Sequence, residues 1–119
     1  HGAVDYAELH HWYARTDLAV FASSCETFGQ ILVEAMASGL PIACSNRSAM
    51  PEILGGAGTY FNPESPTEIA NAIRLLVESV DLRQDRAQIA FDQAKAFSWS
   101  RCAHETFEFL SQVVRQRNT

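Results

Sequence analysis

Two patterns of apolar residues alternate along the chain. The first is a short strand-like run. It occurs at residues 18–22, which are apolar on both faces, and at residues 41–45, which are apolar up to Cys44 and end in Ser45. Such runs are typical of strands in a parallel sheet that helices cover on both sides. Residues 59–61 predict a third strand after the glycine-rich turn at 55–58, whose spacing does not fit a dinucleotide-binding fingerprint. We therefore expect about three strands.

The second pattern is helical spacing, with apolar residues three or four positions apart. Capping residues mark some of the boundaries. Ser65 followed by Pro66 and Glu68 is a strong helix start, and Gly39 with Pro41 beyond it is typical of a helix end. The pattern predicts helices at 5–15, 28–38, 66–79, 81–96 and 99–115 and a short helix at 50–54. In the helix at 66–79, the positions expected to be buried are Ile69, Ala72, Ile73, Leu76 and Val77.

This order of elements implies strands that pair in parallel through right-handed helical crossovers. The predicted fold class is therefore α/β, with a short parallel sheet of about three strands flanked by helices. Three strands are few for a doubly wound domain. Because no earlier strand is available to pair with residues 18–22, we expect an exposed apolar sheet edge and a homodimer or a swapped arrangement formed through it.

The stretch 25–34 joins the first predicted strand to the helix that follows it. Thr27 occupies the expected N-cap position, and Gln30 three residues later completes a capping-box pattern. Gly29 lies in the expected first turn, where a bare backbone lets a ligand approach unpaired N–H groups. These N–H groups and the helix dipole both favour an anion. We expect a phosphate to bind the backbone N–H groups of Phe28, Gly29, Gln30 and Ile31.

Two glutamates bracket this helix start, Glu26 just before it and Glu34 about two turns along. Eight residues at helical rise span roughly 12 Å, about the reach from a sugar past a diphosphate to a ribose. A carboxylate can accept hydrogen bonds from two hydroxyls at once. Glu34 is therefore expected to hold a ribose diol while Glu26 faces the sugar. The alternatives are that Glu34 is a solvated helix position and that Glu26 only favours the helix dipole.

Other residues near this stretch have structural interpretations. Phe28 is expected to anchor the core rather than to stack on a base. Cys25 is expected to be a small loop filler, and nothing in the sequence pairs it with a base. The adjacent His10 and His11 point in different directions on a helix, so we do not expect them to bind a metal.

The residues from Glu26 to Pro41 read ETFGQILVEAMASGLP, and they resemble the donor-binding motif of the group 1 (family 4) glycosyltransferases. The segments Met50-Pro51-Glu52 and Phe97-Ser98-Trp99 are also similar to that family. Its members are retaining enzymes of the GT-B fold, with two glutamates separated by seven residues. The resemblance implies that Glu26 contacts the transferred sugar as the catalytic residue. It implies donor binding by Thr27, Phe28, Gly29, Gln30, Ile31 and Glu34.

The resemblance covers only the later part of the family's second domain. Residues 1–119 are therefore expected to form a single partial domain, which is a partial Rossmann-like (GT-B C-terminal) domain. The acceptor domain and the first strands, which normally carry an Arg and a Lys for the diphosphate, have no counterpart here. The implied activity is transfer of a sugar, with retention, from a nucleotide-diphosphate sugar to a saccharide or lipid-linked saccharide. We expect this chain to be inactive alone.

Two alternatives remain open for the function. The first is a GT-B nucleotide-sugar epimerase, and the second is a non-catalytic interaction module that kept the fold and lost the reaction. Retention of both Glu26 and Glu34 argues against loss of the reaction.

Composition and charge exclude several other classes. The chain has 119 residues, of which 47% are apolar and 19% are charged, and this suits one soluble domain. A net charge of −5 gives no basic footprint for nucleic acid. No apolar run approaches the roughly 20 residues of a membrane span. Three cysteines without metal-like spacing argue against a disulfide framework. We expect a cytoplasmic protein without metal or cofactor, and leave open that the full-length protein is membrane-peripheral.

Overall fold

Three parallel strands in the order β1-β2-β3 form the sheet in the computed structural model, which describes residues 1–117. β2 (Ile42–Ser45) is central, and β1 (Ala19–Phe21) and β3 (Gly58–Phe61) lie on either side of it. The register pairs the first residue of each strand with the first residue of its neighbour. The carboxyl ends of the strands therefore lie at one edge of the sheet. The expected parallel sheet of about three strands is confirmed, with boundaries within one residue of the prediction.

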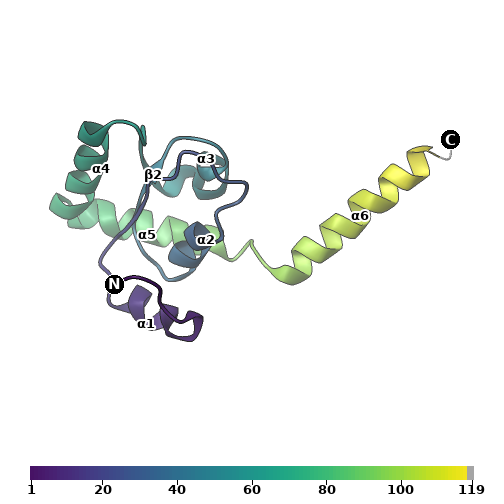
Figure 1. Ribbon diagram of the computed structural model, residues 1–119, viewed down its shortest axis with the longest axis horizontal. Helices are drawn as coiled ribbons and strands as arrows, with labels where there is room; N and C mark the ends of the chain where they lie inside the picture. Colours follow the sequence, from purple (N-terminus) through teal and green to yellow (C-terminus); the bar gives the residue numbers. More distant parts are fainter. Residues whose placement is uncertain (118–119) are drawn as a thin grey trace.

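Helices connect the strands and cover the sheet (Figure 1). Each helix that the apolar spacing predicts is present, and a short 3-10 helix precedes α1 and another follows α3. In chain order the helical elements are η1 (Tyr6–Glu8), α1 (Leu9–Ala14), α2 (Gln30–Ala37), α3 (Met50–Leu54), η2 (Gly55–Ala57), α4 (Pro66–Glu78), α5 (Val80–Ala94) and α6 (Trp99–Arg117).

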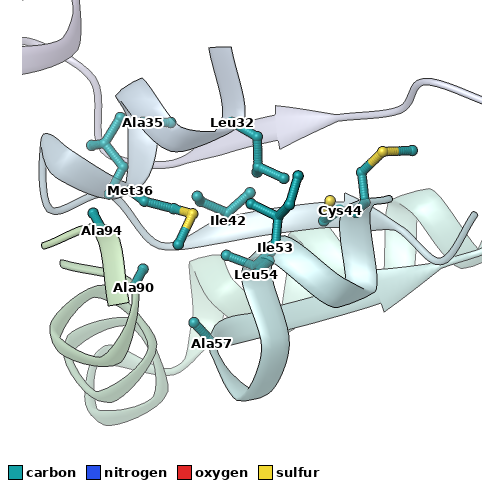
Figure 2. Packing of buried hydrophobic residues seen from close by; sticks show 12 residues of the cluster. Leu32, Ala35, Met36, Ile42, Cys44, Ile53, Leu54, Ala57, Ala90 and Ala94 are labelled. Atoms are coloured by element: carbon teal, nitrogen blue, oxygen red, sulfur yellow. The ribbon is translucent and has the colours of Figure 1, made fainter. Parts of the chain in front are cut away.

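The central strand β2 is buried along its whole length and separates two apolar clusters. Ile42 and Cys44 belong to the cluster that α2, α3 and α5 complete (Figure 2). Ala43 belongs to the cluster on the other face, together with Phe61 and residues of α4. Successive side chains of a strand point to opposite faces, so a strand covered on both sides buries all its side chains. In β2 these are the apolar Ile42, Ala43 and Cys44 and, at its end, Ser45, whose hydroxyl accepts a hydrogen bond from the Arg47 N–H. This explains the continuous apolar run in the sequence.

The helix α4 begins as its capping residues predict. The Ser65 hydroxyl oxygen accepts a hydrogen bond from the Glu68 backbone N–H at 3.3 Å. Ala72 and Leu76 of this helix are buried against the sheet. The prediction that Val77 is buried is wrong, because its side chain is 56% exposed. Val77 lies one position beyond Leu76, and the 100° step of the helix turns it out of the narrow contact face.

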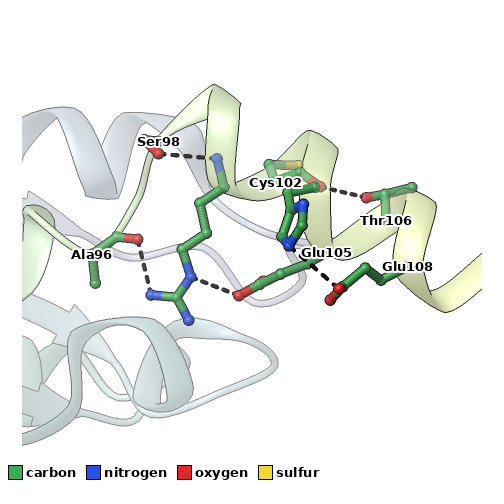
Figure 3. Close-up of polar contacts among 8 residues, drawn as sticks. Ala96, Ser98, Cys102, Glu105, Thr106 and Glu108 are labelled. Carbon is green, nitrogen blue, oxygen red and sulfur yellow. Dashed lines mark hydrogen bonds and ion pairs between the residues drawn. The ribbon is translucent and has the colours of Figure 1, made fainter.

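The last helix, α6, extends away from the sheet and buries none of its residues (Figure 1). Ser98 caps its start, because the Ser98 hydroxyl accepts a hydrogen bond from the Arg101 backbone N–H at 3.1 Å (Figure 3). The Arg101 side chain pairs with Glu105 at 2.6 Å, and such exposed pairs contribute little to stability. Within residues 1–117, no helix combines the length and hydropathy that crossing a membrane requires.

Candidate functional site

The loop between β1 and α2 carries the predicted site, and its geometry at Gly29 differs from the expected one. Helix α2 begins at Gln30, and Gly29 is its N-cap with φ 78° and ψ 62°. This left-handed conformation favours glycine. The Gly29 carbonyl accepts a hydrogen bond from the Leu32 N–H at 2.9 Å. The prediction of a Thr27 cap and a helix starting at Phe28 is wrong, because the left-handed turn separates both residues from the helix.

The start of α2 carries no side-chain cap. Gln30 and Ile31 are the first residues of the helix, and N–H groups of a first turn have no acceptor within their own helix. Together with the positive end of the helix dipole they favour an anion. Of the four predicted phosphate-binding N–H groups, the structure thus places two in the first helical turn and two, those of Phe28 and Gly29, just before it.

Glu34 lies on α2 and is held by a residue that the sequence did not suggest for the site. The Tyr13 hydroxyl, from α1, donates a hydrogen bond to Glu34 Oε2 at 3.1 Å. Burial and this hydrogen bond, in that order, raise the pKa of Tyr13 to about 12. By its spacing in the sequence, Tyr13 is one of several apolar positions of the predicted helix at 5–15. No local signal could have linked it to Glu34, which lies 21 residues further along.

Glu26 is half-buried in the loop after β1, and its backbone is held by the loop after β2. The Ser48 hydroxyl donates a hydrogen bond to the Glu26 carbonyl at 2.6 Å, and it accepts one from the Glu26 N–H at 3.3 Å. Within residues 1–117, no hydrogen bond or ion pair involves the Glu26 carboxylate. One predicted glutamate is therefore fixed through its side chain, whereas the other is fixed through its backbone and has a free carboxylate.

Phe28 is not a core anchor, contrary to the prediction. Its side chain is 45% exposed, and its ring meets the ring of Phe97 edge-on at 5.7 Å between centroids. Ile31, which has the same helical spacing as the apolar residues of this stretch, is 61% exposed. The core contacts of α2 come from Leu32, Ala35 and Met36, which share the predicted helical spacing. The late helix start removes Phe28 from the helical periodicity on which the prediction depended.

The cysteines near the site differ in their environment. Cys25 is exposed in the loop beside Glu26, and Cys44 is buried in β2. Burial raises the pKa of the Cys44 thiol to about 12, so it is protonated at neutral pH and inert as a nucleophile. Within residues 1–117, no group of three or more His, Cys, Asp or Glu side chains could hold a metal ion.

The loops after β1 and β2 thus meet at the carboxyl edge of the sheet. Ligands of open α/β sheets bind at this edge. The Ser48 hydrogen bonds join the two loops, and α2 starts directly after the first of them. This arrangement defines a parallel α/β domain with a helix start, flanked by two glutamates, at the carboxyl edge of its sheet.

The comparison with known proteins agrees with this class. Residues 1–93 match the family described as glycosyl transferases group 1, and the chain belongs to this family. The O-antigen chain mannosyltransferase B of Escherichia coli is 33% identical over 105 residues, which are 88% of this chain and 28% of the relative. A D-inositol 3-phosphate glycosyltransferase of Paenarthrobacter aurescens is 30% identical over 109 residues, 90% of this chain and 27% of that protein. The chain therefore spans between a quarter and a third of the length of these curated relatives.

Two solved structures share the fold. The C-terminal domain of a glycosyl transferase group 1 family protein (LpcC) from Francisella tularensis superposes with a TM-score of 0.71 at 32% identity, covering 81% of this chain and 50% of that one. Sucrose-phosphate synthase from Thermosynechococcus elongatus gives a TM-score of 0.84 over 98% of this chain and 30% of its own. Because the two sequences are only 23% identical, this structural likeness shows a shared fold and nothing further. The expected GT-B fold class is confirmed.

Proposed function

We propose that this chain is the donor-binding part of a retaining glycosyltransferase that uses a nucleotide-diphosphate sugar. The observation that carries the proposal is the uncapped start of α2, which follows β1 directly and lies between Glu26 and Glu34. The family to which the chain belongs supports it.

The diphosphate of the donor binds at the start of α2 in this proposal. As the glycosidic bond breaks, the leaving diphosphate gains negative charge. Donors and dipoles that already point at this charge stabilise it more in the transition state than in the ground state, which is how a preorganised site accelerates a reaction. The first-turn N–H groups of Gln30 and Ile31 are the donors of this kind.

The two glutamates act at opposite ends of the donor. Glu34 accepts hydrogen bonds from the ribose hydroxyls, and the Tyr13 hydroxyl on Oε2 fixes the orientation of its carboxylate. A carboxylate has about four lone-pair sites, so one tyrosine leaves capacity for a ribose diol. Glu26, with its free carboxylate, contacts the transferred sugar.

The acceptor side lies outside this chain in the same proposal. We propose that residues 1–119 form a single partial domain, that they show no transferase turnover alone, and that the acceptor is a saccharide or a lipid-linked saccharide. Two of the relatives are named for mannose transfer to an O-antigen chain and for D-inositol 3-phosphate, so acceptors differ widely in this family. The free cysteines fit a cytoplasmic location.

The test is a panel of nucleoside diphosphates and nucleotide sugars measured by calorimetry and turnover on the full-length protein. Glu34→Gln keeps the size of the side chain and an acceptor for Tyr13, but removes the charge. We expect nucleoside diphosphate affinity to fall roughly tenfold or more, the worth of a hydrogen bond to a charged group. Glu78→Gln, at the exposed end of α4, is the matched control and should bind as the wild type does.

Three results would contradict this proposal. Wild-type protein that binds no nucleotide would favour a non-catalytic interaction module. Donor consumption without a glycosylated acceptor would favour an epimerase. Equal affinities for Glu34→Gln and Glu78→Gln would remove Glu34 from the donor site.

A further inference from the structure

Ser48 has an unusual backbone conformation. Its φ is 55°, and within residues 1–117 no other residue except glycine has a positive φ. A left-handed conformation is unfavourable for a residue with a side chain, and it persists only where the surrounding structure holds it. Such residues cluster at functional sites, so an observed case is a reason to ask what the conformation achieves.

The surrounding structure does hold this loop. Ser45, at the end of β2, is fully buried, and its hydroxyl accepts a hydrogen bond from the Arg47 backbone N–H at 3.2 Å. The Arg47 carbonyl accepts one from the N–H of Met50 at 3.4 Å. Met50 is fully buried and begins α3. The loop is therefore anchored at both ends, with Ser48 between the anchors.

The conformation of Ser48 allows its hydroxyl to contact both polar backbone groups of Glu26. One hydroxyl donates to the Glu26 carbonyl at 2.6 Å and accepts from the Glu26 N–H at 3.3 Å. The two residues are 22 positions apart and belong to loops after different strands. Holding both backbone groups of one residue limits the rotation of its backbone and so the direction of its side chain.

We propose that Ser48 is a positioning residue that sets the orientation of Glu26 toward the sugar of the donor. This inference depends on the proposed function, because it assumes that Glu26 contacts the sugar. In this proposal Ser48 acts only through the Glu26 backbone and contacts neither the sugar nor the diphosphate. Its effect is therefore confined to the sugar end, whereas the nucleoside diphosphate binds through α2 and Glu34.

A purely structural role would give a different result. If the two hydrogen bonds only joined the loops after β1 and β2, their loss would destabilise both loops at the carboxyl edge of the sheet. Affinity for nucleoside diphosphate and for nucleotide sugar would then fall together. The ratio of the two affinities separates the two roles.

The experiment uses Ser48→Gly in the full-length protein. This substitution removes the hydroxyl and suits the positive φ, so the fold is retained. Ser48→Ala removes the hydroxyl without relieving the backbone, and it should reproduce the effect on ligand binding. The matched control is Ser38→Gly, because the Ser38 hydroxyl donates a similar bond, at 2.8 Å, to the carbonyl of the other glutamate, Glu34.

Affinities for a nucleoside diphosphate and for its nucleotide sugar are measured by calorimetry, and kcat and KM by turnover. We expect Ser48→Gly to weaken nucleotide-sugar binding about tenfold relative to nucleoside diphosphate, and to lower kcat, as small displacements of catalytic groups do. Nucleoside diphosphate affinity should stay within about twofold of the wild type. For Ser38→Gly, the ratio of nucleotide-sugar affinity to nucleoside diphosphate affinity should equal that of the wild type.

Hydrogen exchange of the Glu26 amide tests the contact itself without a ligand. It should be faster in Ser48→Gly than in the wild type. Unchanged exchange overturns the inference, and so does an equal loss of affinity for both ligands. In both of these cases the proposed function still stands if the wild type binds nucleotide sugars. Failure of the wild type to bind any nucleotide overturns both.

Discussion

Gly29→Ala tests the geometry at the start of α2 most directly, because the structure separates its two effects. A Cβ at this position would lie 3.6 Å from the Leu32 Cβ and 3.7 Å from the nearest atoms of the Phe21 ring. These are ordinary van der Waals distances, so no steric overlap contributes. What remains is the φ of 78°, which an alanine adopts only with strain.

The magnitude follows from two opposing terms. The left-handed conformation costs an L-residue about 1–2 kcal/mol. Replacing glycine also restricts the unfolded chain, which offsets about 0.4–1 kcal/mol of this. We therefore expect Gly29→Ala to lower the free energy of unfolding by about 1 kcal/mol, which corresponds to a fall in Tm of about 4 °C for a domain of this size.

The matched control is Gly39→Ala, at the other end of α2. Its φ is 70°, and a Cβ there would have no atom within 4 Å. Chemical denaturation should show nearly the same loss for both variants. Only Gly29→Ala should also weaken nucleoside diphosphate binding, because only it alters the backbone at the first turn. Stability equal to the wild type would refute the left-handed cap, and unchanged affinity would refute the phosphate site.

Three further predictions concern the thiols, the alkaline pH range and the sheet edge. A thiol reagent should modify the exposed Cys25 and Cys102 rapidly in the native state, and Cys44 only on unfolding. The free energy of unfolding should fall as pH rises from about 9 to about 12. Burial is the main cause that raises three native pKa values to about 12. The pKa of Cys44 rises from an unfolded value of 9, and those of Tyr13 and Tyr60 rise from an unfolded value of 10. Light scattering of this chain should show a homodimer at high concentration, because β1 is an edge strand.

Each of these has a clear contrary outcome. Three rapidly reacting thiols in the native state would show that β2 is accessible. The sign of the pH effect follows from the raised native pKa. Below pH 9 the Cys44 thiol is protonated in both the folded and the unfolded chain, so its contribution to stability is fully present. Between pH 9 and about 12 the unfolded chain loses this proton more readily than the folded chain, so the contribution is lost as the pH rises. Tyr13→Phe should reduce this pH dependence, and an unchanged slope would contradict the assignment. Light scattering that detects only monomer would count against pairing at β1.

Local patterns in the sequence determined most of the fold. The apolar run at 18–22 and the run at 41–45, apolar up to Cys44, predict strands buried on both faces. Both strands are present, and β2 is buried along its whole length, whereas Val20 of β1 is 44% exposed. The Ser65 cap and the left-handed Gly39 lie where the sequence places them. Caps and periodicity depend on residues within about four positions of each other, so the sequence is sufficient to predict them.

The sequence also placed Glu26 and Glu34 on either side of a helix start, but the tertiary structure decided how they are held. Tyr13 meets Glu34 across 21 positions, and Ser48 meets Glu26 across 22. These contacts exist because the parallel sheet brings loops from different strands to one edge, and no local rule describes them. The conformation at Gly29 is another feature that the local pattern does not predict. Thr27 and Gln30 form a plausible capping box by spacing, yet the helix begins at Gln30, after the left-handed Gly29. Local preference suggested one helix start, and the structure has another, one that follows a left-handed turn at the buried Gly29.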